Sequence, residues 1–98
     1  MNNLSSIYLS LGSNIGNREN NLKLALKELS EILRIKKISS IYDTEPLLYQ
    51  KQENFLNIVV EVSYFNEAQS LLKNIKDIEK KMGRKATFRF GPRIIDID

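Results

Sequence analysis

The sequence predicts a fold of the α+β class, in which an antiparallel sheet carries two helices on one face. Three observations support this class: segments with apolar residues at alternate positions, two segments with apolar residues at helical spacing, and the order of these segments. The order is β-α-β-β-α-β, which right-handed crossovers turn into the ferredoxin-like arrangement, with the other sheet face open. A length of 98 residues fits one domain, which we assign to residues 1–98.

The first half of the chain is expected to form a strand, a helix and a second strand. Apolar residues alternate over 7–11, and the glycine-containing segment 12–16 then indicates a turn. Residues Arg18 to Leu33 show helical spacing after Asn17, a residue type that often caps a helix N-terminus. The mixed β-branched and polar stretch Ile35–Tyr42 predicts the next strand, which ends before a loop.

The second half is expected to form a strand, a helix and a last, truncated strand. Alternation is clearest over Phe55–Tyr64. Asn66, followed by Gln69 three residues later, predicts a capping box at the start of the second helix, and Gly83 predicts its end. The segment Ile94–Asp98 predicts a strand that is cut short, with Asp98 at a frayed end. The apolar stripe expected to face the core comprises Ala68, Leu71, Leu72, Ile75, Ile78 and Met82.

The composition excludes several kinds of chemistry. The chain has no Cys and no His, which rules out disulfides, cysteine or histidine nucleophile systems and the usual zinc ligands. We expect a cytoplasmic protein without a membrane span, because the longest apolar run is only a few residues and the N-terminal segment lacks the pattern of a secretory signal. Carboxylates, Arg and Lys are left to bind or transform a ligand.

Two aspartates near the C-terminal end form a candidate metal site. Asp96 and Asp98 are two residues apart on the last predicted strand, so their carboxylates project from the same face. Mg²⁺ is commonly held by one or two carboxylates together with substrate phosphates. An Asp-x-Asp pair alone is weak evidence, because a solvated strand end explains it equally simply.

Basic residues gather just before this pair. Six Lys and Arg residues occupy positions 80–93 without an acid among them. The two lysines at 80 and 81 are explained by a solvated helix C-terminus, where cations complement the helix dipole. The arginines Arg84, Arg89 and Arg93 suit multidentate contact with phosphate oxygens. Phosphoryl-type transfer needs positioning, metal ions and cations rather than a protein nucleophile, so the absence of His does not argue against it.

The open sheet face offers a candidate site for a flat heterocycle. Phe55 and Asn57 alternate with Leu56, so an aromatic ring and an amide share the face opposite the core. The simpler alternative is that Phe55 covers an exposed sheet and Asn57 is a surface polar residue. Gly12 and Gly16 are explained by turn chemistry, because no phosphate-binding glycine motif accompanies them.

Four motifs in this order resemble one enzyme family. They are Gly-Ser-Asn at 12–14, Thr-Glu-Pro at 44–46, Phe-Leu-Asn at 55–57 and Gly-Pro-Arg-Ile-Ile-Asp-Ile-Asp at 91–98. Together they closely resemble the 6-hydroxymethyl-7,8-dihydropterin pyrophosphokinases of folate biosynthesis, and the resemblance covers the whole chain. It implies transfer of pyrophosphate from ATP, as cosubstrate, to the hydroxymethyl group of the pterin, giving AMP, with two Mg²⁺ ions.

The resemblance also implies roles for individual residues. Asp96 and Asp98 match the metal-binding pair, and Asp96 also matches a residue that helps to orient the attacking hydroxyl. Arg84 and Arg93 match arginines that contact the triphosphate, which makes these arginines and the two aspartates the candidate catalytic residues. The implied ATP-binding residues are Lys76, which stands where the family often has a glutamine, together with Glu79, Arg84, Arg89 and Arg93. The implied pterin-binding residues are Thr44, Glu45, Leu47, Phe55, Asn57 and Phe90.

Two alternatives remain beside the enzyme. Family members continue well past the Asp-x-Asp strand, so the chain corresponds to the N-terminal portion of the family fold and is either a fragment or a truncated, noncatalytic remnant that binds nucleotide or pterin. The βαββαβ order also suits an RNA-binding module. The third strand argues against that module, because 54–61 lacks the required Gly and basic residue. We therefore expect small-molecule partners, no nucleic acid, no membrane and a monomer.

Overall fold

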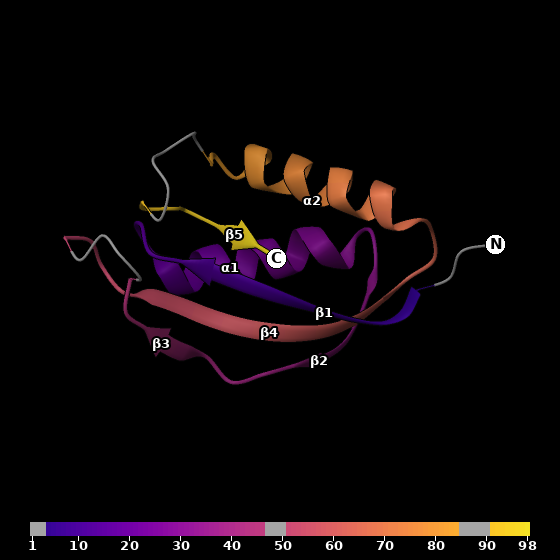
Figure 1. Ribbon diagram of the computed structural model, residues 1–98, viewed down its shortest axis with the longest axis horizontal. Coiled ribbons are helices and arrows are strands. Elements are labelled where there is room, and N and C mark those ends of the chain that lie inside the picture. The colour runs from indigo at the N-terminus through magenta and orange to yellow at the C-terminus, as the bar shows by residue number, and fades with distance from the viewer. Residues whose placement is uncertain (1–3, 47–50, 85–90) are drawn as a thin grey trace.

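Two helices cover one face of a five-stranded antiparallel sheet in the computed structural model, which describes residues 4–46, 51–84 and 91–98 (Figure 1). The α+β, ferredoxin-like class predicted from the sequence is thereby confirmed. The elements are β1 (Leu4–Ser13), α1 (Arg18–Ser30), β2 (Arg34–Ile38), β3 (Tyr42–Thr44), β4 (Phe55–Tyr64), α2 (Ala68–Lys81) and β5 (Asp96–Ile97).

The sheet is built around the two long strands β1 and β4. Its order is β2-β4-β1-β5, and β3 pairs with the same strand, β4, as β2 does. Along the β1–β4 ladder Leu11 lies opposite Ile58 and Gly12 opposite Asn57, and β5 adds Asp96 on the other side of Gly12. The strand β1 therefore lies between β4 and β5, the two strands in or next to which most candidate site residues lie.

The predicted strand 35–42 is wrong in one respect, because it forms two strands instead of one. Ile38 pairs with Val60 and Tyr42 pairs with Asn57. The chain thus advances by four residues from Ile38 to Tyr42, whereas their partners on β4 are only three residues apart. Ser39 occupies the interruption: its hydroxyl accepts a hydrogen bond from the amide of Val59 at 2.8 Å in place of a ladder bond. The extra residue behaves as a bulge, and the chain then pairs as far as Thr44.

The first helix begins as the sequence predicts. The side chain of Asn17 accepts a hydrogen bond from the amide of Asn20 at 3.0 Å, which is the expected N-cap contact. The helix ends at Ser30, three residues earlier than the predicted Leu33. Leu33 is nevertheless buried, because the turn that follows the helix still directs it into the core.

The second helix differs from the prediction at its start. Its N-cap is Glu67, which makes no side-chain cap bond, so the predicted capping box at Asn66 is wrong. The Asn66 side chain instead accepts a hydrogen bond from the adjacent amide of Glu67. Ala68 and Leu72, predicted to be part of the buried stripe, are both exposed, Leu72 to 60%. Gly83 ends the helix with φ +95, as predicted, and neither helix is long and apolar enough to cross a bilayer.

The core lies between the helices and the sheet, and it also holds the short strand β5 in place. Ile95 is completely buried and Ile97 is 6% exposed, so both neighbours of Asp96 are anchored in the core. Because side chains alternate along a strand, Asp96 and Asp98 project to the opposite, open face. Residues completely buried in this core are Leu11, Ala25, Leu29, Val60, Val62 and Ile95.

We expect truncation of Leu11 to destabilise the fold far more than truncation of Leu72. Leu11 is completely buried, so Leu11→Ala leaves a cavity and should lower the free energy of unfolding by about 2–5 kcal/mol. Leu72→Ala is the matched control and should change it by less than about 1 kcal/mol. Urea denaturation monitored by circular dichroism measures both, and equal losses would contradict the placement of Leu72 at the surface.

Candidate functional site

A row of three residues crosses the open sheet face and defines the site. Gly12 on β1 lies between Asn57 of β4 and Asp96 of β5 in the strand register. A Cβ atom at Gly12 would come within 2.7 Å of the Asn57 Oδ1 atom and 3.3 Å of the Phe55 ring. The sequence suggested that turn chemistry explains Gly12. This prediction is wrong, because Gly12 lies inside a strand. Gly16, at φ +69, does fit that explanation.

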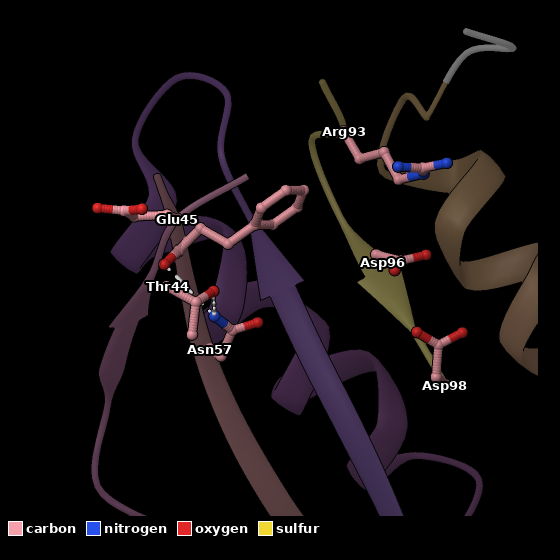
Figure 2. A pocket seen from close by; sticks show the side chains of 7 residues that line it. Thr44, Glu45, Asn57, Arg93, Asp96 and Asp98 are labelled. Atoms are coloured by element: carbon pink, nitrogen blue, oxygen red, sulfur yellow. Dashed lines mark hydrogen bonds between the residues drawn. The ribbon is translucent and has the colours of Figure 1, made fainter. Parts of the chain in front are cut away.

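A cleft of about 520 Å³ opens above this row. Figure 2 shows its two sides, with Thr44, Glu45 and Asn57 on one side of β1 and the β5 side chains on the other. The glycine leaves β1 without a side chain where the two sides face each other. The residues that line the cleft are Thr44, Glu45, Phe55, Asn57, Arg93, Asp96 and Asp98, all of them predicted from the sequence.

The β3–β4 side presents a fixed amide beside an aromatic ring. The Asn57 Nδ2 atom donates to the Thr44 hydroxyl at 2.7 Å, and to the Phe55 carbonyl at 3.3 Å. These bonds direct the Oδ1 atom of Asn57 toward Gly12. Phe55 is half-buried beside it. An oriented amide next to an aromatic ring can hold the edge and the face of a flat heterocycle.

The β5 side carries the two carboxylates on one face, as predicted. The backbone of Asp98 exchanges two hydrogen bonds with Ser10, at 2.7 and 2.9 Å. The expectation that Asp98 lies at a frayed strand end is therefore wrong, because the ladder with β1 extends to this residue. Both carboxylates have a defined position at the edge of the cleft (Figure 2).

Electrostatics make this carboxylate pair receptive to a cation. Partial burial of the carboxylate, repulsion from Asp96 and the nearby charge of Glu79 raise the pKa of Asp98, and the Arg84 guanidinium opposes the rise. No group of three or more His, Cys, Asp or Glu side chains suited to a metal ion occurs among the described residues. Two carboxylates fit Mg²⁺ when substrate phosphates supply further oxygen ligands. The donor set is thus compatible with the predicted metal, without showing it.

Arg84 is engaged with carboxylates at the rear of the site. Its Nη1 atom donates to Glu79 Oε2 at 2.5 Å and to Asp96 Oδ1 at 3.0 Å. Glu79 is only 6% exposed, and the same oxygen accepts a hydrogen bond from the amide of Ile97 at 2.9 Å. The structure therefore joins Glu79, Arg84 and Asp96, which the family resemblance implies in ATP and metal binding, into one partly buried network.

Arg93 has an unused hydrogen-bond donor. Its Nη1 atom donates to the Gly91 carbonyl at 3.0 Å. Its Nε atom is the only buried side-chain nitrogen or oxygen without a hydrogen-bond partner in the ranges 4–46, 51–84 and 91–98. A buried unpaired donor is costly, so its presence at the edge of the cleft points to an acceptor that a ligand would bring.

Asn14 is a residue whose role the sequence did not reveal. It is 3% exposed, and its Oδ1 atom accepts from the Arg93 amide at 2.8 Å. Its Nδ2 atom donates to the Gln52 side chain at 2.7 Å and to the Glu53 carbonyl at 3.0 Å. Asn14 therefore links three chain segments around the cleft. Its place in the Gly-Ser-Asn motif at 12–14 is a signal that the sequence did contain, but the motif does not indicate its partners.

A second cavity of about 540 Å³ lies between β1 and α2, and Asp98 lines both this cavity and the first. Its walls are mainly apolar, from Ile7, Leu9 and Leu71, and Lys76 and Glu79 also line it. The structure thus separates these two residues from the cleft that holds Asn57. The predicted site residues Leu47, Arg89 and Phe90 lie outside the described residues.

Comparison with known proteins identifies a family and several relatives of this chain. The sequence profile of the family described as 7,8-dihydro-6-hydroxymethylpterin-pyrophosphokinase matches residues 8–98. A protein from Aquifex aeolicus named 2-amino-4-hydroxy-6-hydroxymethyldihydropteridine pyrophosphokinase is 43% identical over 97% of the chain, and its namesake from Bacillus subtilis is 41% identical over 100%. The Dictyostelium discoideum folic acid synthesis protein FOL1 is 42% identical over 94% of the chain. The chain spans 59% of each bacterial relative and 14% of FOL1.

Substitution of Gly12 should disturb the site through Asn57. In Gly12→Ala the new methyl group would press on Asn57 Oδ1, so we expect loss of the Asn57–Thr44 hydrogen bond and destabilisation of about 1–3 kcal/mol. Side-chain amide resonances of Asn57 and denaturation curves measure the two effects. Gly16→Ala is the control, because it strains the backbone without any nearby atom to displace. Unchanged Asn57 resonances in Gly12→Ala would contradict this contact.

Removal of the Asp98 charge should stabilise the ligand-free protein at neutral pH. Because the folded state raises the pKa of Asp98, it binds this proton more tightly than the unfolded chain, and stability falls as pH rises through the interval between the two values. Asp98→Asn avoids this loss, so its thermal midpoint at pH 7 should exceed that of the unsubstituted protein by about 2–4 °C. The difference should shrink below about pH 4. Equal midpoints at pH 7, with Asp77→Asn as control, would contradict the repulsion.

Proposed function

Since this chain belongs to the 7,8-dihydro-6-hydroxymethylpterin-pyrophosphokinase family, we propose that it transfers pyrophosphate from ATP to 6-hydroxymethyl-7,8-dihydropterin in folate biosynthesis. The observation that carries this proposal is the cleft itself. It combines a site suited to a heterocycle, at Phe55 and Asn57, with a site suited to phosphates and a cation, at Arg93, Asp96 and Asp98. Transfer between two substrates requires both halves in contact, and Gly12 leaves the space between them open.

The pterin binds on the β3–β4 side of the cleft. Phe55 stacks against the ring, and the amide of Asn57, held by Thr44, forms hydrogen bonds with the heterocycle edge. Glu45 lines the same side. Leu47 and Phe90, implied by the family resemblance, complete the proposed pterin site.

The triphosphate of ATP binds on the β5 side. Arg93 offers its unpaired Nε to a phosphate oxygen, and Arg84, whose Nη1 atom pairs with the two carboxylates, can contact phosphate through its other guanidinium N–H groups. Arg89 is proposed as a third cation. Lys76 and Glu79 line the second, mainly apolar cavity, which would receive the remainder of the nucleotide. Asp98 lines both the cleft and this cavity, so it borders both parts of the proposed nucleotide site.

Asp96 and Asp98 would hold two Mg²⁺ ions together with the phosphates, and these ions would neutralise charge that develops on the phosphate oxygens. The hydroxymethyl oxygen bonds to the β-phosphorus of ATP, the bond from this phosphorus to the oxygen of the α-phosphate breaks, AMP leaves, and the hydroxyl proton is released to solvent. Asp96, on the Gly12 row opposite Asn57, accepts a hydrogen bond from the attacking hydroxyl and orients it. The arginines stabilise the added charge of the transition state.

Further properties follow the same proposal. We expect a monomeric, single-domain cytoplasmic protein whose partners are small molecules, and no nucleic acid. The RNA-binding alternative is not favoured, because the open face carries a carboxylate pair where a nucleic acid backbone would require cations. A noncatalytic remnant remains the main competing outcome, because the chain spans 59% of its bacterial relatives.

The proposal is tested by AMP formation from ATP, Mg²⁺ and 6-hydroxymethyl-7,8-dihydropterin. The 98-residue chain is compared with a version extended by any coding sequence that follows Asp98. Turnover by either version supports the proposal, and turnover by the longer one alone identifies the chain as a fragment of the enzyme. Absence of turnover in both contradicts it and favours the remnant.

Two substitutions separate the halves of the site. Asp96→Ala should lower turnover by at least about 100-fold, because it removes a metal ligand, while pterin binding changes by less than about threefold. Asn57→Ala should weaken pterin binding by about tenfold, the loss expected for one or two hydrogen bonds. Calorimetric titration and AMP release measure these effects. Equal pterin affinity in Asn57→Ala would contradict the assignment of that face.

A further inference from the structure

Glu79 holds an unusual position for a residue that borders a substrate site. Its side chain lies on α2 but is 6% exposed, and its Oε2 atom accepts two hydrogen bonds. One donor is the amide of Ile97, between the two aspartates, and the other is the guanidinium of Arg84, which also contacts Asp96. Protein donors therefore engage one oxygen of this carboxylate, although the residue also lines the second cavity.

The contact with Ile97 lies on the side of β5 that no other strand of the described residues occupies. Asp98 exchanges both backbone hydrogen bonds with Ser10 of β1, so in an antiparallel ladder the groups of the preceding residue point away from β1. The outward amide of Ile97 meets Glu79 Oε2 at 2.9 Å. This amide lies between the two aspartates, so β5 is held from one side by β1 and from the other by Glu79.

The contact with Arg84 extends this control to a side chain. Arg84 donates from the same Nη1 atom to Glu79 and to Asp96 Oδ1, the latter at 3.0 Å. Glu79 therefore acts on the Asp-x-Asp segment through its backbone and through a bridging arginine. Glu79, Asp96 and Asp98 bring three carboxylates close together, and Arg84 links two of them by donating to both.

We propose that Glu79 is a positioning residue that fixes the register and direction of Asp96 and Asp98 by accepting the Ile97 amide and orienting Arg84. Its consequence for turnover rests on the proposed pyrophosphokinase function, whereas its structural part does not. The role differs from direct nucleotide contact, which the family resemblance implies for this position.

The test compares Glu79→Ala and Glu79→Gln with Asp77→Asn, a matched control that alters an exposed carboxylate on the same helix. Amide hydrogen exchange of Ile97 is measured by NMR in the ligand-free protein, with Val60 in the central strand as internal reference. Glu79→Ala should accelerate exchange at Ile97 by about tenfold relative to Val60, as expected for one lost hydrogen bond. Glu79→Gln retains an acceptor oxygen and should accelerate it by less than about threefold, and Asp77→Asn should leave it unchanged.

The kinetic arm uses whichever version of the protein forms AMP. Glu79→Ala should lower kcat by about 10- to 100-fold and change the KM for ATP by less than about threefold, because misplaced aspartates impair the chemical step. Unchanged exchange at Ile97 with a raised KM for ATP would overturn the proposal in favour of nucleotide contact. Equal acceleration at Ile97 and Val60 in both Glu79 variants would also overturn it, because the effect would then be global. The exchange measurement needs no turnover. It therefore tests the positioning role of Glu79 even if the proposed pyrophosphokinase function fails.

Discussion

The pairing of β1 with both β4 and β5 is the interaction on which the rest of the site depends. It brings Asn57 and Asp96, which are 39 positions apart in the chain, to either side of Gly12. Since side chains on a strand alternate between faces, one register sets both the buried leucines and the exposed site residues. A slip of one residue would move the amide and the carboxylates into the core. Stability and site geometry are therefore consequences of the same ladder.

Gly12 is needed because neighbouring side chains lie close to its Cα atom, and not because of its backbone dihedral angles. A side chain at this position would collide with Asn57 Oδ1, so the glycine serves close approach and leaves room between the two halves of the cleft. The bulge at Ser39 has a related effect, because it re-aligns the following residues with β4 and places Thr44 beside Asn57. Gly12 and the bulge at Ser39 thus both act on the orientation of the Asn57 side-chain amide.

Charge in the site is incompletely balanced within the protein, and this imbalance suits binding of an anion together with a cation. Asp98 is repelled by its neighbours, while Arg93 keeps a buried donor unpaired. Bringing phosphate oxygens and Mg²⁺ into the cleft would relieve both costs together. Asn14 and Glu79 do not remove this imbalance, because their oxygens accept hydrogen bonds from backbone amides. Glu79 accepts from β5, and Asn14 accepts from the segment before it. The protein thereby holds its functional groups in place before a ligand arrives.

The sequence by itself determined the fold class, most element positions and the identity of the cleft residues, because hydrophobic period and short motifs are local signals. It could not determine which residues from distant segments contact each other. The division of 35–42 into two strands, the exposure of Leu72 and the pairing of Asp98 with Ser10 depend on contacts between distant segments. Only the tertiary structure shows why Gly12 must be a glycine and that Glu79 reaches the strand between the aspartates, since both facts concern atoms brought together by folding and carry no local pattern.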